Sequence, residues 1–228
     1  MNKKNRISDM VSGREKKIRS IGTGAVFAGV FFITGIAAPF LKITAYGKTI
    51  RPPQISIAMA TPYDEVMVQR ISEEREMDEI HIAVSLKTRT LFLCYGTQII
   101  DRFIAQVGMN SEEGDKCFRG DKRTPRGEYY VCLKKADSQY YRALGLSYPN
   151  VKDADRGYES GLITKGERDA IAASIAQGTM PDWNTALGGY IEIHGEKGGP
   201  TEGCVAVGNP VMDCLWPVTE LGCRVRIY

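Results

Sequence analysis

One histidine and one cysteine near the C-terminal end of the chain have the types and the spacing of a base and a nucleophile. His194 ends a short apolar run, a glycine-rich loop follows, and Cys204 opens the next apolar run. We expect the loop to reverse the chain, so that the two side chains meet across the mouth of a hairpin. A neutral imidazole can then take the thiol proton, and the resulting ion pair favours the nucleophilic thiolate. The sequence therefore predicts Cys204 as a nucleophile and His194 as its base.

Backbone groups beside the cysteine complete a predicted site for acyl transfer. The N–H groups of Gly203 and Cys204 can point at the oxyanion of an acyl intermediate. A backbone carbonyl is enough to orient the imidazole, so a third, acidic residue is not required. We expect Gly195, Thr201 and Glu202 to line the substrate cleft. From the residues alone, a buried structural cysteine beside an incidental histidine is the alternative.

Several segments resemble the L,D-transpeptidase catalytic domain family (YkuD-like), in the order in which that family has them. Residues His194–Gly195 and Thr201–Cys204 match its signature, a histidine-glycine pair followed by Ser/Thr-x-Gly-Cys. Residues Gly120–Tyr129 are similar to its GD-x-R-TP-x-G-x-Y element. Two further segments resemble inserts of one subgroup, Ala143–Asn150 and Pro181–Gly189. The resemblance covers residues 79–228.

The resemblance implies both a fold and a reaction. The fold would be mainly β, a YkuD-like antiparallel β-sandwich or barrel with one or two short helices. The Cys204 thiolate would attack the amide carbonyl between the third and fourth residues of a peptidoglycan stem tetrapeptide, and D-Ala would leave. The side-chain amine of a neighbouring stem peptide would then resolve the thioester and form a 3-3 cross-link. Neither a metal nor a cofactor would take part.

Two positions depart from the pattern of the family. Many members have an arginine where this chain has Ala206, and a histidine where it has Glu202. The loop between His194 and Cys204 is also shorter than in many relatives, which suggests a more open mouth. Hydrolysis of the same thioester, as in an L,D-carboxypeptidase or an amidase, is therefore an alternative. A non-catalytic wall-binding anchor protein is a second alternative, although a pure binder has no need of a nucleophile.

The N-terminal part of the chain has the charge and hydropathy of a membrane anchor. Residues 1–20 carry seven Lys and Arg residues against two acidic residues, so the basic excess belongs to this tail and no basic face for nucleic acid is indicated. Residues 21–41 are an uncharged run, and about 20 apolar residues suffice for a transmembrane helix. Because flanking cations stay in the cytoplasm, we expect a single-pass signal anchor with the remainder of the chain on the extracytoplasmic side. A cleaved signal peptide is the alternative.

From residue 79 onward the apolar residues alternate with polar ones, as is typical of half-buried strands. Short turns separate the runs, which favours antiparallel neighbours in one sheet. His81 is expected on the solvent side of the first strand. The predicted strands are residues 80–86, 91–95, 99–107, 127–133, 189–194, 205–207 and 223–228.

Helix signals occur at three places. Thr61 caps a short charged helix within a linker region at residues 42–78. Thr164 and Glu167 form a capping box for a helix in the catalytic domain, and Asn209 begins a second short helix there. The expected organisation is therefore a basic tail, a membrane helix, a linker and one catalytic domain at residues 79–228.

The cysteines other than Cys204 carry no metal-binding pattern. Their spacing is irregular and no CxxC pair occurs, so neither a zinc site nor a thioredoxin motif is indicated. In an exported chain they are candidates for structural thiols or disulfides. They are Cys94, Cys117, Cys132, Cys214 and Cys223.

Overall fold

The computed structural model describes residues 44–45, 48–49, 79–195 and 198–228, and it divides into two units, residues 1–54 and 55–228. In the first unit, β1 (Thr44–Ala45) pairs with β2 (Lys48–Thr49) in an antiparallel ladder. The predicted tail at residues 1–20, the membrane helix at 21–41 and the helix beginning at Thr61 lie outside the described residues. Within the described ranges, no helix is both long and apolar enough to span a bilayer.

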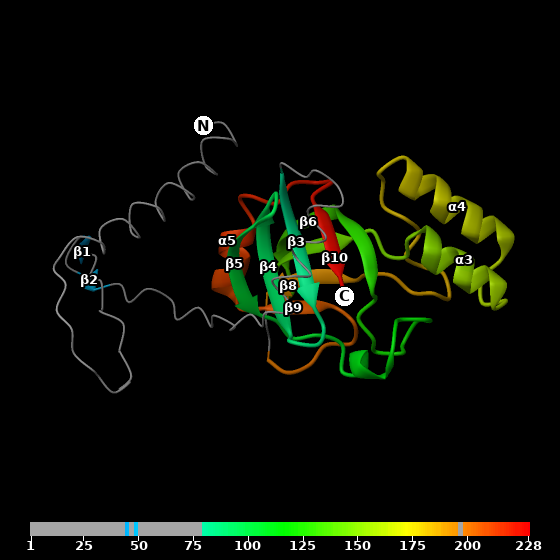
Figure 1. Ribbon diagram of the computed structural model, residues 1–228, viewed down its shortest axis with the longest axis horizontal. Helices are drawn as coiled ribbons and strands as arrows, with labels where there is room; N and C mark the ends of the chain where they lie inside the picture. The colour runs from blue at the N-terminus through cyan, green and yellow to red at the C-terminus, as the bar shows by residue number, and fades with distance from the viewer. Residues whose placement is uncertain (1–43, 46–47, 50–78, 196–197) are drawn as a thin grey trace, which may run out of the picture. The chain divides into compact units, whose positions relative to one another are not determined.

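An eight-stranded sheet is the framework of the described part of the second unit (Figure 1). Its strand order is β5-β4-β3-β10-β6-β7-β8-β9, so the last strand of the chain lies inside the sheet. The bounds are β3 Ile80–Ser85, β4 Thr90–Tyr95, β5 Gln98–Ile104, β6 Gly127–Ser138, β7 Tyr141–Leu146, β8 Glu192–Gly195, β9 Val205–Val207 and β10 Arg224–Ile227. The mainly β fold that the sequence predicted is confirmed.

The sheet is mainly antiparallel, as the sequence predicted, but two of its strand pairs are parallel and were not expected. β10 runs parallel to β3, and β9 runs parallel to β8, whereas the other neighbours are antiparallel. Parallel neighbours need a connection that carries the chain back along the sheet. Between β8 and β9 this connection includes the described residues 198–204. Turn residues in a sequence mark where a strand ends, but they do not indicate the direction of the next strand.

The sheet closes on itself through the segment that follows β5. Gln106 and Ala206 exchange both backbone hydrogen bonds at 2.8 Å, and this joins the segment to the outer edge of β9. A second bridge links Gly108 with Thr201. The architecture is therefore barrel-like, and the loop that precedes β9 is held between two segments distant in sequence.

One face of the strands carries two long rows of buried apolar residues. Successive side chains of a strand point to opposite faces, so directly opposed residues of neighbouring strands share a face. Two rows of opposed residues are fully buried: Leu93, Ile82 and Val225 across β4, β3 and β10, and Leu144, Ile193 and Val205 across β7, β8 and β9. The alternate residues of β8 and β9 face the other way, and these include the predicted base.

Two helices lie together at one side of the domain (Figure 1), α3 (Val151–Glu159) and α4 (Lys165–Ala176). They pack through a small buried cluster made of Ala154, Ile163, Ile171 and Leu187. α4 begins at the predicted capping box, whereas α3 was not predicted. Asn150 caps α3, and its side chain accepts from the Asp153 N–H while the Asp153 carboxylate accepts from the Asn150 N–H.

A third helix, α5 (Asn209–Leu215), begins where the sequence predicted a short helix. A turn of 3-10 helix, η1 (Ser111–Glu113), lies in the loop between β5 and β6. The described domain thus contains three α-helices where one or two were expected.

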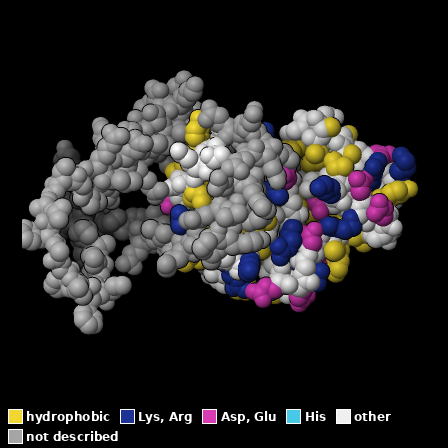
Figure 2. Space-filling model, in the orientation of Figure 1, with side chains coloured by type: hydrophobic (Ala, Val, Ile, Leu, Met, Phe, Trp, Pro, Cys, Tyr) yellow, Lys and Arg dark blue, Asp and Glu magenta, His cyan; other side chains and the backbone are white. Residues whose placement is uncertain are grey.

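Charges of both signs are interspersed on the visible face of the domain (Figure 2). On the helices, Arg168 pairs with Asp155 and Asp169 at 2.7 and 2.9 Å. Exposed pairs of this kind contribute about 0–1 kcal/mol each. They are therefore minor terms in stability beside the buried rows of the sheet.

His81 and the cysteines differ from their expected environments. His81 is buried, between Cys94 and Arg224 in the register of the sheet, and burial lowers the pKa of its imidazole. Its expected solvent-side position was wrong, because both faces of β3 are covered. All six cysteines are free thiols, so the disulfide alternative is not realised. Burial raises the pKa of the Cys94 thiol to about 12, so this thiol is protonated at neutral pH.

Candidate active site

The candidate nucleophile and base lie on adjacent parallel strands, not across a hairpin. His194 belongs to β8, and Cys204 immediately precedes β9. Ile193 lies opposite Val205, and His194 lies opposite Ala206. The expected hairpin is therefore wrong, because β9 runs parallel to β8. Cys204 and His194 still share one face of the sheet, since both alternate with the buried Ile193–Val205 pair.

Both side chains line one cavity of about 680 Å³. This volume lies within the range of roughly 300–1,000 Å³ that is typical of ligand sites. The predicted Thr201 and Glu202 also line it. Its other charged and aromatic lining residues are Lys116, Arg119, Lys135, Glu192, Tyr140 and Tyr190.

The Cys204 thiol is a half-buried, protonated group. Its Sγ donates to the carbonyl oxygen of Tyr190 at 3.3 Å. Burial raises the pKa of the thiol to about 11; a hydrogen bond from the Glu192 backbone lowers it, the Glu192 carboxylate raises it, and Lys116 and Lys135 lower it. At neutral pH the thiol therefore carries its proton, and a base must remove that proton before attack.

His194 is oriented by one backbone carbonyl and one aromatic ring. Its Nδ1 lies 2.7 Å from the carbonyl oxygen of Gly195. Because a carbonyl can only accept, Nδ1 carries the hydrogen and Nε2 is left as the acceptor. The Tyr140 ring stacks on the imidazole, with centroids 4.4 Å apart and 22° between the planes. The imidazole is therefore held in the tautomer that a general base requires.

Two threonine hydroxyls hold the loop that carries the cysteine. Thr201 Oγ1 donates to the Cys204 carbonyl oxygen at 2.6 Å, and Thr124 Oγ1 donates to the same oxygen at 3.4 Å. Thr201 Oγ1 also accepts from the Gly203 N–H at 3.1 Å. One of the two N–H groups expected to stabilise an oxyanion is thus engaged within the loop.

The glycines of the signature allow close packing. Gly203 has a φ of 136°, and a Cβ there would lie 2.9 Å from the Arg123 carbonyl oxygen. A Cβ on Gly195 would lie 2.4 Å from both Asn209 Oδ1 and the Tyr140 carbonyl oxygen. Gly195 therefore lets β8 pack closely behind the cavity, and it is absent from the cavity lining.

The segment that resembles the GD-x-R-TP-x-G-x-Y element forms a loop against the cysteine loop. Asp121 accepts from the backbone N–H groups of Cys117, Phe118 and Arg123, and its Oδ1 lies 2.7 Å from Lys116 Nζ. Burial would raise the pKa of Asp121, but the Lys116 ammonium and these N–H groups together lower it. The aspartate is thus the centre of this turn, and it positions Lys116 in the cavity wall.

Sequence reasoning missed several residues of the cavity wall. Lys116, Lys135, Tyr140 and Glu192 come from the loop before β6, from β6, from the turn before β7 and from β8. Register across β6–β8 brings Lys135 and Glu192 together, and a sequence does not supply register. The alternation within β8 was the one usable signal, because Glu192 and His194 are two residues apart and so share a face.

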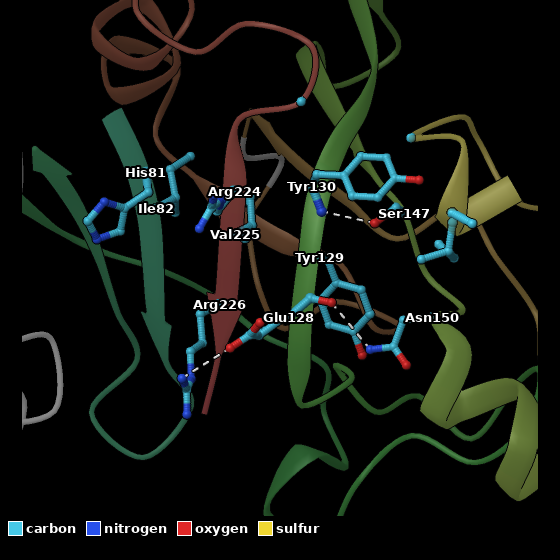
Figure 3. A pocket seen from close by; sticks show the side chains of 14 residues that line it. His81, Ile82, Glu128, Tyr129, Tyr130, Ser147, Asn150, Arg224, Val225 and Arg226 are labelled. Carbon is cyan, nitrogen blue, oxygen red and sulfur yellow. Dashed lines mark hydrogen bonds and ion pairs between the residues drawn. The ribbon is translucent and has the colours of Figure 1, made fainter. Parts of the chain in front are cut away.

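A second cavity of about 500 Å³ lies against other strands and contains no part of this pair (Figure 3). It is lined by β3, β10 and β6, with His81, Arg224 and Tyr130 directly opposed across the three strands. Arg226 pairs with Glu128 there at 3.2 Å. None of its lining residues is a cysteine, so the predicted chemistry belongs to the first cavity. Among the described residues, no group of three or more His, Cys, Asp or Glu could hold a metal ion.

The model of the family described as YkuD, L,D-transpeptidase catalytic domain, matches residues 79–227. The chain belongs to this family. The resemblance read from its sequence is thereby confirmed, and no curated protein matches the chain.

Solved structures are also similar to this chain. The L,D-transpeptidase of Xylanimonas cellulosilytica has 17% identity and a TM-score of 0.40, over 68% of this chain and 62% of that one. Bd1075 of Bdellovibrio bacteriovorus has 19% identity and a TM-score of 0.44, over 76% and 51%. An L,D-transpeptidase of Enterococcus faecium has 13% identity and a TM-score of 0.40, over 67% and 50%. The matched part thus covers between half and two thirds of those chains.

Proposed function

We propose that this chain is a cell-wall L,D-transpeptidase that is acylated on Cys204 by a peptidoglycan stem tetrapeptide. The observation that carries the proposal is the placement of Cys204 and His194 in one cavity and on one face of β8 and β9. Membership of the family supplies the reaction class. The Nδ1–carbonyl bond of His194 supports its role, because that bond leaves Nε2 to take a proton.

In the proposed first half-reaction, His194 Nε2 takes the proton of the Cys204 thiol. The thiolate attacks the amide carbonyl between the third and fourth residues of the donor stem. The Cys204 N–H, next to the engaged Gly203 N–H, donates to the oxyanion. The C–N bond breaks, D-Ala leaves with the proton from the imidazolium, and a thioester remains. For the proton transfer, the thiol must turn from the Tyr190 carbonyl towards the imidazole, a change that commonly accompanies substrate binding.

In the second half-reaction, the side-chain amine of a neighbouring stem peptide attacks the thioester. His194 takes a proton from the attacking amine, the C–S bond breaks, and Cys204 leaves as the thiolate, which regains its proton from the His194 imidazolium. The product is a cross-link between two third-position residues. The chain's own groups account for each proton in this sequence.

Hydrolysis of the thioester is the second candidate reaction, and two residues of the cavity support it. Ala206 presents only a methyl group to the cavity, and Glu202 is an exposed carboxylate 3.9 Å from Lys122. Neither residue closes the acceptor side to water. Water in place of the amine would make the chain an L,D-carboxypeptidase or an amidase. A non-catalytic wall-binding protein is disfavoured, because the cavity contains both a nucleophile and an oriented base.

We further propose that residues 21–41 anchor the chain in the cell membrane, with the catalytic domain on the extracytoplasmic side. The uncharged run of 21 residues and its flanking cations support this topology. An extracytoplasmic domain would meet peptidoglycan directly. The proposed partners are accordingly the stem peptides and the membrane.

Purified disaccharide-tetrapeptide tests the proposed function directly. The full-length chain in detergent is incubated with it, and the products are weighed by mass spectrometry. Transpeptidation gives a dimer that has lost one D-Ala, whereas hydrolysis gives the tripeptide. Cys204→Ala, incubated in parallel, should give neither. If the unaltered chain also gives neither product, the proposal is contradicted.

A further inference from the structure

The cavity contains a charged pair that the proposed reaction does not use. Lys135 Nζ and Glu192 Oε1 lie 2.8 Å apart. The Glu192 side chain is 10% exposed and that of Lys135 is 40% exposed, so the carboxylate is the buried partner. A buried carboxylate is costly unless a cation compensates it. Lys135 supplies that cation from β6, a strand that is not adjacent to β8.

The register of the sheet places this pair beside the nucleophile. One row of directly opposed residues crosses β6, β7, β8 and β9, and it consists of Lys135, Ala143, His194 and Ala206. Glu192 lies two residues before His194 and Cys204 two residues before Ala206, so all of them share the cavity face. The small side chain of Ala143 leaves room for Lys135 to reach over β7 to Glu192. Ala206 brings no charge to this row.

The other charged groups of the cavity have different partners. Lys116 is bound to Asp121 at 2.7 Å, and Arg119 donates to the carbonyl oxygens of Trp183 and Thr185 at 3.1 and 3.2 Å. Glu202 is exposed at the rim near Lys122. His194 is the base itself. Lys116 and Lys135 both lower the pKa of the Cys204 thiol, whereas the Glu192 carboxylate raises it. Lys135–Glu192 is therefore the ion pair of the cavity in which both charges act on the sulfur of Cys204.

We propose that the Lys135–Glu192 pair is a positioning device that controls how readily Cys204 ionises. An uncompensated Glu192 carboxylate would repel the thiolate, and Lys135, its ion-pair partner, opposes that repulsion alongside Lys116, so that His194 can remove the thiol proton. Both charges act on the Cys204 thiol, in opposite directions. The inference rests on the proposed role of Cys204 as the nucleophile, and it does not depend on which product the thioester gives.

The two single substitutions should shift the pKa of the Cys204 thiol in opposite directions. Lys135→Met leaves the carboxylate unopposed and should raise the pKa of the thiol by about one unit, whereas Glu192→Gln leaves the ammonium unopposed and should lower it by about one unit. In the double variant, the pKa of the thiol should be close to that of the unaltered chain. Lys135→Arg keeps the positive charge, so its thiol pKa should also match that of the unaltered chain. At a fixed pH below the pKa of the thiol, a shift of one pKa unit changes the fraction of thiolate about tenfold. The alkylation rate at that pH should change by the same factor.

The rate of alkylation by iodoacetamide reports the ionisation of the Cys204 thiol and requires no wall substrate. The rate of modification is followed by mass spectrometry from pH 6 to pH 11, and peptide mapping restricts the readout to Cys204 among the six cysteines. Lys165→Met is the matched control, because it removes a lysine from an exposed ion pair on α4 with no part in the cavity. Its profile should coincide with that of the unaltered chain.

Three results would overturn the proposal. The first is a pair of single variants that shift the profile in the same direction or not at all. The second is a double variant whose shift equals the larger single shift. The third is a pair of variants that lower the melting temperature while the profile stays unchanged, which would make the pair merely structural. Opposed shifts in a chain that gives no wall product would keep this inference and reject the proposed function.

Discussion

At the scale of single residues, the proposed nucleophile, Cys204, is a protonated thiol in the free chain. Burial raises the pKa of Cys204 to about 11, and the thiol donates to Tyr190 in this state. A thiol of this kind is a poor nucleophile at neutral pH, because alkylation and oxidation both proceed through the thiolate. In the proposed reaction, attack depends on His194, whose Nδ1 bond to the Gly195 carbonyl leaves Nε2 available to take the proton.

Replacing the two residues should separate their roles. Cys204→Ala should abolish turnover and the covalent adduct with a carbapenem, the β-lactam class that the family resemblance implies. His194→Ala should retain slow acylation while turnover falls by about 10²–10⁴, the usual contribution of a positioned acid–base group. Intact-mass and turnover measurements check both. Single alanine variants of Cys94, Cys117, Cys132, Cys214 and Cys223 are the controls, and an adduct that maps to one of them contradicts the assignment.

At the scale of elements, the sequence predicted what alternation and caps determine, and it missed what register determines. Alternation located β3 and β9, and the Thr164–Glu167 box located α4. α3 was missed because Gly157 and polar residues obscure its apolar stripe, and because its cap begins at Asn150, the last residue of a segment interpreted as an insert. The parallel β8–β9 pair was missed because the direction of a strand depends on contacts with residues distant in sequence.

The cap of α3 should make stability depend on pH. Burial raises the pKa of Asp153 to about 6, although the Asn150 N–H and Arg156 oppose this rise. The folded state thus holds the proton more tightly than the unfolded chain, whose aspartates titrate near 4. This contribution to stability is present below about pH 4 and is lost as the pH rises through about 6. Relative to Asp153→Asn, the unfolding free energy should fall by roughly 2 kcal/mol between pH 4 and pH 7. Urea titrations at both pH values measure the unfolding free energies of the two chains. A difference between the chains that is the same at both pH values would contradict the prediction.

Removing the last strand should unfold the catalytic domain. β10 lies between β3 and β6, and its Val225 and Ile227 are each 1% exposed. Deleting residues 223–228 removes about 1.5–3 kcal/mol for each buried side chain and also separates β3 from β6. The free energy of unfolding of a typical domain is only about 5–15 kcal/mol in total. Circular dichroism should show no cooperative melt for the truncated chain, whereas an unchanged melting temperature would make this end dispensable.

At the scale of the whole molecule, charge and hydropathy divide the chain at the end of the run at residues 21–41. The catalytic fold begins at residue 79 and accounts for the family match at residues 79–227. The cations of residues 1–20 belong to a different part of the chain from the interspersed charges of the domain. A peptidoglycan substrate is meaningful for this domain only if it is exported, so topology decides whether the proposed function is accessible.

A reporter fused to Tyr228 tests that topology. With residues 21–41 as a single-pass anchor, the cations of the tail stay inside and the C-terminus is exported. Alkaline phosphatase, which is active only after export, should therefore be active in the fusion, and a reporter that is active only in the cytoplasm should be silent. Membrane fractionation distinguishes an anchored chain from a cleaved one, because cleavage releases the active reporter from the membrane.

Substituting Asp for Phe31 and Phe32 is the matched control, since two charges in the centre of the run cost roughly 2.5–3.5 kcal/mol each on insertion scales. That variant should lose phosphatase activity. A phosphatase fusion that is inactive in the unaltered chain would contradict both the anchor and the wall substrate.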